Sequence, residues 1–212
     1  ASNAQNGNRV IDLGGGGTSA ASYGIFLRNQ FDAIVANNTI VGAGHGNAQY
    51  GIATDNTTST VSTGVNISNN NITISGGTSP SQGYLGIDNK IGIGASNAVN
   101  IQNNTVSVGS SATTTTGFVQ AIKNTTAANQ TIGTINITGN RVYKSNMASG
   151  TGLWTAIQNQ GLGGASATTI NLNNNTIDTN AVLATGTLAG ISNAFSNYGT
   201  LNITGNRITN NN

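Results

Sequence analysis

An asparagine stands between two large aliphatic residues at matching positions of a repeat along this chain. Alternation of this kind is typical of a β-strand, in which neighbouring side chains point to opposite faces. After each unit a second mark follows, an asparagine two positions before an aliphatic residue, as at Asn70 and Ile72. The five units are Val65-Asn66-Ile67, Val99-Asn100-Ile101, Ile135-Asn136-Ile137, Ile170-Asn171-Leu172 and Leu201-Asn202-Ile203.

The second mark recurs along nearly the whole chain, at steps of 30 to 36 residues. A period of this length with strand-like alternation predicts a solenoid of stacked coils rather than a domain around a single compact core. We therefore expect one solenoid domain over residues 1–212, with residues 1–10 either a partial coil or the remnant of an expression tag. The marking asparagines are Asn8, Asn38, Asn70, Asn104, Asn140, Asn175 and Asn206.

Each coil is expected to hold three short strands. The aliphatic–asparagine–aliphatic unit is the first, and an Asn- and Gly-rich turn leads into the second, as in Ser68-Asn69-Asn70 before Ile72-Thr73-Ile74. Asn and Gly tolerate the left-handed backbone that sharp turns require. A small residue and then an Ile-Xaa-Asn motif mark the third strand. The clearest of these motifs are Ile87-Asp88-Asn89, Ile122-Lys123-Asn124, Ile157-Gln158-Asn159 and Ile191-Ser192-Asn193.

Short strands about every ten residues, without a helical period and with a single proline, predict an all-β protein. Turns such as Asn37-Asn38-Thr39-Ile40, Asn103-Asn104-Thr105-Val106 and Asn174-Asn175-Thr176-Ile177 resemble the repeats of pectate-lyase-like folds and of bacterial surface β-helix proteins. The resemblance covers residues 8 to 209. It implies a right-handed parallel β-helix of about six to seven coils, each of 30–36 residues with three strands. It implies no activity, because this fold hosts many functions.

Asparagine suits such a stack because its amide both donates and accepts, so a column of amides spaced ~4.8 Å apart can bond continuously. Two columns are expected to face inward and satisfy turn backbone that water cannot reach. The first inward column comprises Asn38, Asn70, Asn104, Asn140, Asn175 and Asn206. The second comprises Asn89, Asn124, Asn159 and Asn193. An outward column is expected at Asn66, Asn100, Asn136, Asn171 and Asn202.

The outward column has two interpretations. It is either a soluble sheet face whose amides satisfy one another, which we favour, or a flat polar surface that binds a glycan or a neighbouring chain. An ice-binding face is a third, lower-ranked alternative, and it would need a regular threonine column. The outward column of the second strand is too uneven for that, since it reads Val41, Thr73, Ser107, Tyr143, Asp178 and Thr209.

Charge and composition bound the partners. Charged residues make up 6% of the chain, with seven Lys and Arg against five acidic residues, all Asp. The basic residues are spread out, so nucleic acid is not expected as a partner. No apolar run is long enough to cross a bilayer, and without cysteine there is neither a disulfide nor a thiolate metal site. We expect no membrane insertion, no cofactor and no metal.

Only one pair of carboxylates suggests catalysis. Asp55 and Asp88 each directly precede a third-strand asparagine, in neighbouring coils. They are considered because glycoside hydrolysis uses two carboxylates ~5 to 9.5 Å apart. A surface ion pair between Asp88 and Lys123 on the next strand explains the residues more simply. The resemblance to lyases stops at the fold, because those calcium-dependent enzymes need several clustered acidic ligands. We predict that the protein is not an enzyme.

Other isolated residues suggest no chemistry. His45 stands alone in a glycine-rich loop, and Gly14 to Gly17 lack the Lys-Ser/Thr ending of a phosphate-binding loop. Counting back from the third-strand isoleucines points Tyr23 and Tyr50 inward. The same count points Tyr84 and Trp154 outward, two coils apart. The weak candidates for glycan contact are therefore Asp55, Asp88, Trp154 and Tyr84.

The ends of the repeat suggest a role. A coil end exposes unpaired sheet edges, and neither end of the chain shows an amphipathic capping helix. We expect the ends to meet other copies of the chain or flanking repeats, with glycans as a further partner class. The expected function is that of a non-enzymatic structural or adhesive solenoid, secreted or displayed on a bacterial surface. The alternative is a carbohydrate-binding or carbohydrate-cleaving module, for which Asp55, Asp88 and Trp154 must share one groove.

Overall fold

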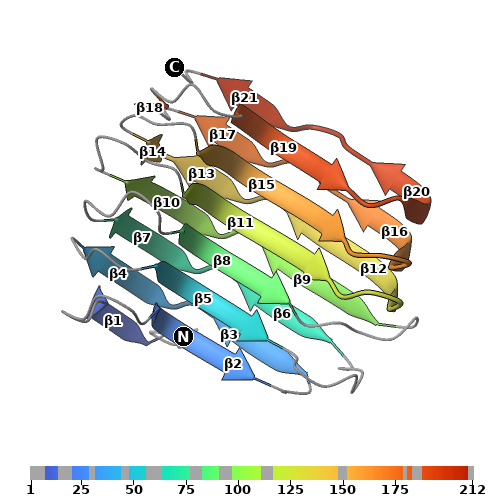
Figure 1. The fold of residues 1–212 in the computed structure, drawn as a ribbon, viewed down its shortest axis with the longest axis horizontal. Helices are drawn as coiled ribbons and strands as arrows, with labels where there is room; N and C mark the ends of the chain where they lie inside the picture. The colour runs from blue at the N-terminus through green and yellow to red at the C-terminus, as the bar shows by residue number, and fades with distance from the viewer. Residues whose placement is uncertain are drawn as a thin grey trace, which may run out of the picture.

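The protein is a parallel β-solenoid whose coils stack from the N-terminal end to the C-terminal end (Figure 1). The computed structural model describes residues 8–13, 21–28, 32–43, 48–55, 64–76, 83–90, 97–110, 117–147, 152–178, 181–182 and 188–209. All regular structure in these ranges is β-strand, which confirms the all-β prediction. Within the same ranges, no helix could span a membrane.

Three parallel sheets run the length of the stack. Sheet A follows the path β1 (Arg9–Leu13), β4 (Thr39–Ala43), β7 (Asn71–Gly76), β10 (Thr105–Ser110), β13 (Arg141–Tyr143), β17 (Thr176–Asp178) and β21 (Arg207–Thr209), with β14 (Asn146–Met147) and β18 (Ala181–Val182) beside it. Sheet B comprises β2 (Ser22–Arg28), β5 (Gln49–Asp55), β8 (Tyr84–Lys90), β11 (Phe118–Thr126), β15 (Leu153–Gly161) and β19 (Leu188–Ala194). Sheet C comprises β3 (Ala33–Ala36), β6 (Val65–Ser68), β9 (Ala98–Gln102), β12 (Thr131–Thr138), β16 (Ser166–Asn171) and β20 (Asn197–Asn202).

The described strands make five complete passages through sheets C, A and B, from β3-β4-β5 to β16-β17-β19. The strands β1 and β2 precede these passages, and β20 and β21 follow them. The number of complete coils is therefore lower than the six to seven predicted, because the coil at each end lacks a strand. Three strands per coil were predicted and are observed.

Columns of aliphatic side chains fill the interior. The strand β6 shows the predicted alternation, with Val65 and Ile67 buried and Asn66 half-exposed on the outer face. Parallel pairing aligns Val65 with Val99 and Ile67 with Ile101 on the next strand, so like side chains stack along the axis. One apolar cluster therefore runs through the solenoid, and neighbouring coils stabilise one another by covering each other's aliphatic residues.

The predicted sharp turn lies between sheets C and A in every coil. The residue before each turn asparagine has a left-handed backbone, which only Asn and Gly adopt without much strain. Asn or Gly occupies this position each time, which confirms the reading of the turn motif. The six residues are Asn37 (φ 60°), Asn69 (φ 57°), Asn103 (φ 55°), Gly139 (φ 66°), Asn174 (φ 56°) and Gly205 (φ 65°).

The third strand interrupts the alternation that the sequence analysis assumed. A Cβ added at Gly86 would lie 2.3 Å from Cγ1 of Val106, so this position faces the core. The next residue, Ile87, is also buried in the core. Gly86 and Ile87 thus both face inward. Side chains earlier in the same strand therefore lie on the face opposite to the one that strict alternation predicts.

This interruption corrects four aromatic assignments. Tyr84 and Trp154, predicted to point outward, are only 0% and 4% exposed and belong to the core cluster. Tyr23, predicted to point inward, is exposed, and Tyr50 is half-exposed beside it. The small residue before each isoleucine leaves room for the backbone to turn two positions toward the core in succession.

We expect Gly86→Ala to lower the free energy of unfolding by about 1–3 kcal/mol, as overpacking in a filled core does. The added Cβ would lie 2.3 Å from Val106 Cγ1 and 2.6 Å from the carbonyl oxygen of Ala121. Urea denaturation followed by circular dichroism measures the change. Gly163→Ala is the matched control, because its Cβ would meet no atom within 4 Å. Equal effects of the two substitutions would contradict the tight fit at Gly86.

Candidate functional site

The turn between sheets C and A carries a ladder of buried asparagines. Asn104 donates from its backbone N–H and from Nδ2 to Oδ1 of Asn140, at 3.0 Å in both cases. Its Nδ2 also donates to the carbonyl oxygen of Ile67 at 2.8 Å. Its Oδ1 accepts from the backbone N–H and Nδ2 of Asn70, at 3.0 and 2.9 Å. One side chain therefore satisfies a backbone N–H of the preceding turn and a strand carbonyl oxygen, and it also bonds the asparagine side chains on both sides.

The same pattern repeats along the stack. Asn38 donates to Asn70 in the way that Asn70 donates to Asn104, and Asn175 donates to Asn206 at the last turn. In five of these asparagines, Nδ2 also donates to the carbonyl oxygen of an aliphatic residue in the first-strand unit of the preceding coil, for example Val35 for Asn70. The five are Asn70, Asn104, Asn140, Asn175 and Asn206. This ladder, which we call the turn ladder, confirms that an inward asparagine column satisfies buried turn backbone.

A second buried ladder lies on the third strand. Nδ2 of Asn89 donates to Oδ1 of Asn124 at 2.7 Å, and Asn124 and Asn159 each donate in the same direction to the next asparagine at 2.8 Å. The ladder begins with Thr54, whose hydroxyl donates to Asn89. Donors in both buried ladders point toward the C-terminal end of the solenoid.

The outward column on sheet C forms a third ladder with the opposite polarity. Asn202 donates to Asn171, Asn171 to Asn136 and Asn136 to Asn100, each at 2.8 Å. These side chains are half-buried, so they are less accessible than the exposed column that was predicted. The ladder stops before Asn66, whose Oδ1 is buried without a hydrogen-bond partner. Mutual satisfaction of the amides fits the interpretation of a soluble sheet face.

The candidate acid pair does not share a column on sheet B. Asp88 aligns with Ala53 on the preceding strand, and Asp55 aligns with Lys90 on the following one. Asp88 forms its ion pair with Lys90, at 3.1 Å, although Lys123 was predicted as the partner. Asp55 lies 3.9 Å from Arg28. The spacing of the Ile-Xaa-Asn motif differs between these coils, and that difference shifts Asp55 two positions along its strand.

Burial governs the protonation of Asp88. The side chain is 3% exposed, and loss of water raises its pKa more than the neighbouring Lys90 lowers it. Burial alone would lower the pKa of Lys90, but the Asp88 carboxylate raises it above its usual value. Tyr50 lies near the same carboxylate, and burial followed by the charge of Asp88 raises its pKa. The carboxylate of Asp88 is buried whereas its partner Lys90 is half-exposed, and the charge of Asp55 further raises the pKa of Asp88.

Three aromatic rings lie together on the outer face of sheet B. Tyr23 stacks on Phe26 with centroids 4.6 Å apart and on Tyr50 with centroids 4.9 Å apart. The guanidinium of Arg28 lies 5.2 Å from the centroid of Phe26. Tyr23 and Phe26 meet because the interruption at Gly24 and Ile25 places both rings outside. The rings mainly cover each other's faces, and a sugar would need such a face to stack on.

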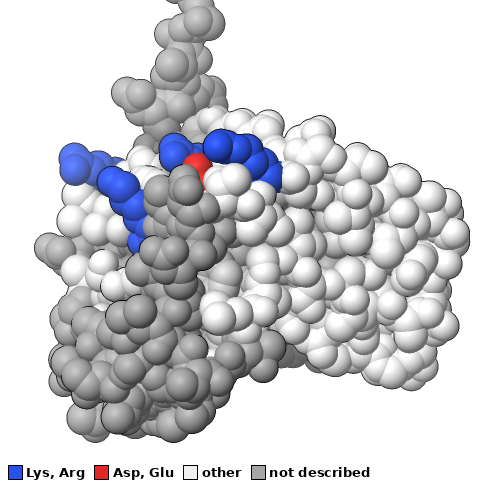
Figure 2. All heavy atoms as spheres, turned by 90° about the horizontal axis from the view of Figure 1, so that it is seen from above, with Lys and Arg blue, Asp and Glu red and all other residues white. Residues whose placement is uncertain are grey.

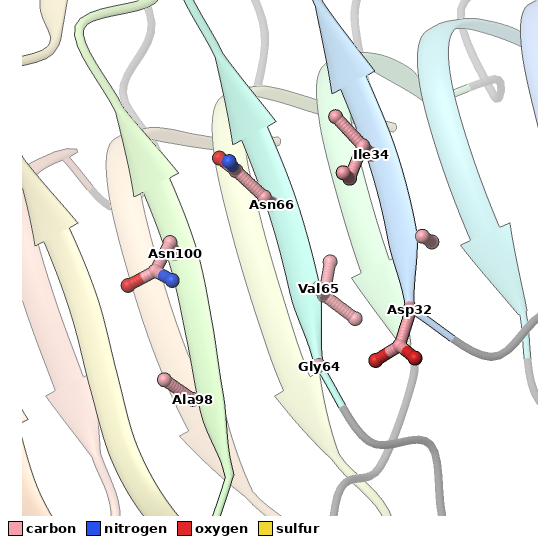
Figure 3. Close-up of a pocket in the computed structure, with 8 residues that line it drawn as sticks. Asp32, Ile34, Gly64, Val65, Asn66, Ala98 and Asn100 are labelled. Carbon is pink, nitrogen blue, oxygen red and sulfur yellow. The ribbon is translucent and has the colours of Figure 1, made fainter.

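A groove of about 410 Å³ lies on the outer face of sheet C, over β3, β6 and β9 (Figure 3). Asp32 lies at its edge, next to Gly64, while Asn66 and Asn100 line it farther along the two neighbouring strands. Ile34 occupies the position that asparagine holds in the later coils, and it is 73% exposed. The groove therefore combines an apolar side chain with the carboxylate of Asp32 and the unpartnered amide oxygen of Asn66.

The predicted site residues do not converge. Trp154 and Tyr84 are in the core, Asp55 and Asp88 lie in ion pairs on sheet B, and the groove lies on sheet C. No three His, Cys, Asp or Glu side chains in the described ranges are placed to hold a metal ion. His45 and the run from Gly14 to Gly17 lie outside the described residues. Sequence reasoning missed the ring cluster and the groove; the small residue before each third-strand isoleucine was the signal for the first.

The uneven second-strand column lies as predicted where its register is defined. Val41 aligns with Thr73 and Thr73 with Ser107, while Tyr143 aligns with Asp178 and Asp178 with Thr209. A tyrosine and a carboxylate interrupt this face, so it offers no regular threonine array.

No protein-family model matches the chain, and no curated protein or solved structure matches it either.

We expect Asn104→Ala to lower the free energy of unfolding by about 3 kcal/mol or more, because it leaves several buried polar groups without partners. The backbone N–H of Asn70 and the carbonyl oxygen of Ile67 are among them. Asn100→Ala is the matched control; it removes one bond from the half-buried outer ladder and should cost about 1 kcal/mol. Urea midpoints of the two variants test the difference, and an equal loss would refute the special role of the turn ladder.

We expect stability to fall as Asp88 ionises. Its pKa is raised in the folded state, so the folded protein holds this proton more tightly than the unfolded chain. The contribution of Asp88 to the free energy of unfolding is therefore largest below the ordinary pKa of ~3.9 and decreases as pH rises through the raised value. Asp88→Asn should flatten this slope, and Lys90→Gln should steepen it. Urea midpoints measured between pH 3 and pH 8 provide the test. A dependence of stability on pH that is unchanged in Asp88→Asn would contradict the prediction.

Proposed function

We propose that the protein is a non-enzymatic structural and adhesive solenoid whose coils continue end to end into a longer array. The observation that carries this proposal is an apolar surface at the C-terminal end. Four large hydrophobic residues there are 43% to 53% exposed although they belong to columns that face the core. They are Leu188, Tyr198, Ile203 and Ile208.

The same columns are buried one coil earlier. Leu188 aligns with Trp154, Tyr198 with Ala167 and Ile208 with Ile177, and the three earlier residues are all buried. The exposure therefore arises because no described strand stacks on β19, β20 and β21. Figure 2 looks onto this end and shows a described surface that is largely uncharged, with Lys and Arg gathered toward one side.

Covering this end would be favourable on two counts. Apolar surface would leave water, which contributes ~25 cal/mol per Å². The strands β19, β20 and β21 also end the three sheets, so their outer edges lack strand partners among the described residues. Unpaired parallel edges over an apolar core form a template for another coil.

The asparagine-rich turns bear on the handedness of the solenoid and on its location. Their likeness to pectate-lyase-like and bacterial surface β-helix repeats supports a right-handed solenoid and a secreted or cell-surface location. Right-handed crossovers are also the general rule for parallel strands. In this role the ladders and aliphatic columns supply stiffness, and the loops and flat faces supply contacts.

Carbohydrate binding is the second candidate, and the groove on sheet C supports it. The carboxylate of Asp32 and Oδ1 of Asn66 are acceptors for sugar hydroxyls, and Ile34 offers an apolar contact. Binding alone fits this groove better than cleavage does, because its lining includes only one carboxylate. The shallow, open form of the groove places this candidate behind the structural one.

A tandem chain tests whether coils continue across the ends. Residues 9–206 are joined twice in series, so that the second copy's Arg9 follows Asn206 directly. We expect one continuous solenoid about 29 Å longer than a single unit, from six added coils at ~4.8 Å each. Hydrogen exchange at β19 and β20 of the first unit should slow, because these edges become paired.

The control is the same tandem with Ile25→Asp in its second unit, which places a charge in the apolar column at the joint. This control should lose the added protection while each unit stays folded. Exchange at β19 and β20 that is as fast in the tandem as in the single chain would refute the proposed function. Small-angle scattering gives the length independently.

A further inference from the structure

The first and last strands of sheet A begin with nearly the same sequence. Gly7-Asn8-Arg9-Val10 leads into β1, and Gly205-Asn206-Arg207-Ile208 leads into β21. Six steps of the repeat separate Asn8 from Asn206. Val10 and Ile208 belong to one inward column, and Arg9 and Arg207 belong to one outward column. Either strand would therefore fit the place of the other in the sheet.

The hydrogen bonds at the two strands are also interchangeable. The backbone N–H of Asn8 donates to Oδ1 of Asn38 at 3.1 Å, and the backbone N–H of Thr39 donates to the carbonyl oxygen of Asn8 at 2.9 Å. Asn206 presents the same N–H and the same carbonyl oxygen at the C-terminal end of the turn ladder. Set in place of Asn8, Asn206 would make both bonds without loss.

The number of strands favours replacement over simple stacking. Sheet A has a path of seven strands, whereas sheets B and C have six each. If β1 of a second copy lay on β21, the positions above β19 and β20 would stay empty. If β2 and β3 of the second copy lie on β19 and β20, the next place in sheet A is already taken by β21. The second copy's own β1 must then leave.

We propose that β21 of one copy replaces β1 of a second copy, so that the chain polymerises head to tail by strand exchange. This inference rests on the proposed function, since it names a second copy as the occupant of the open end. Within sheet A, the pairings of Arg9 with Thr39 and of Val10 with Ile40 are replaced by equivalent pairings of Arg207 and Ile208. The driving force comes from new pairing of β19 with β2 and of β20 with β3.

The two surfaces at this joint are complementary. Continuing each register places Ile208 against Ile40, Ile203 against Val35 and Ile191 against Ile25 of the second copy. Ile25 and Ile191 are only partly buried in a single copy, although every residue between them in their column is fully buried. The exchange therefore covers apolar side chains at both ends.

Electrostatics also separate replacement from stacking. Simple stacking would put the exposed Arg9 directly over the exposed Arg207, and like charges opposite each other on parallel strands repel. Replacement removes Arg9 from the column and leaves Arg207 beside Thr39, the residue that Arg9 itself faces in one copy. A head-to-tail contact of this type does not close and gives filaments.

Intermolecular disulfide trapping tests the inference in the full chain, which has no cysteine. Thr39→Cys and Arg207→Cys are made in separate chains, mixed and oxidised. Paired parallel strands hold their Cα atoms ~4.8 Å apart, within the range that a disulfide spans. We expect a crosslinked dimer that forms at least tenfold faster than in a mixture of Thr131→Cys with Arg207→Cys, in which residue 131 lies on sheet C. Crosslinking of Arg9→Cys with Arg207→Cys instead would establish simple stacking and overturn the exchange.

A second measurement uses a chain that lacks residues 1–13, which leaves the place of β1 empty. We expect the concentration at which light scattering reports filaments to fall at least tenfold. Adding Ile208→Asp to the same shortened chain should abolish the filaments, and excess peptide of residues 201–209 should suppress them. Filaments that ignore the peptide, or monomers at every concentration without crosslinks in the full chain, would overturn the inference. If the full chain stays monomeric but the tandem chain forms one continuous solenoid, the strand exchange is overturned and the proposed function is retained.

Discussion

The solenoid depends on a single hydrogen-bonding unit, the turn asparagine that bonds the turn of the next coil. Each amide oxygen accepts from the backbone N–H and the side chain of the preceding turn asparagine. The amide nitrogen donates both to the next turn asparagine, which also accepts from the backbone N–H, and to a first-strand carbonyl oxygen. A turn without side-chain partners would bury backbone groups that water cannot reach, at a cost of about 1–3 kcal/mol each. The turn can therefore stay tight only where another coil carries the same residue at the same place.

This requirement gives the solenoid a direction. Donors of both buried ladders point toward the C-terminal end, and those of the outer ladder point toward the N-terminal end. In the last turn, the backbone N–H and carbonyl oxygen of Asn206 correspond to the groups of Asn8 that bond Asn38 and Thr39. Apolar columns and sheet edges open at the same place, because all three features depend on a neighbouring coil. The dependence of each coil on its neighbour thus stabilises the middle of the solenoid and leaves its end able to pair with another coil.

The register of sheet B explains where the two candidate acids lie. Asp88 lies on the outer face of sheet B but is buried there, and it forms an ion pair with Lys90, two residues along its own strand. Asp55 lies in another column because the motif spacing differs between coils. In a parallel stack, a shift of two residues separates side chains that an unshifted register would bring together. Each of the two carboxylates therefore has a cation near it, Lys90 for Asp88 and Arg28 for Asp55.

Sequence alone determined the features that repeat. The period, the aliphatic columns, the left-handed turn position and the inward asparagines could all be predicted, because stacking makes each coil obey the same local rules as its neighbours. Tertiary structure decided the rest. Two consecutive inward residues reversed the orientation of Tyr50 before Gly51 and Ile52, and of Tyr84 before Gly86 and Ile87, since strict alternation fails where a small residue lets the backbone approach the core. The partner of Asp88 lies two residues along its own strand, at Lys90. The ring cluster and the groove beside Ile34 depend on register between strands roughly thirty residues apart, which no local pattern specifies.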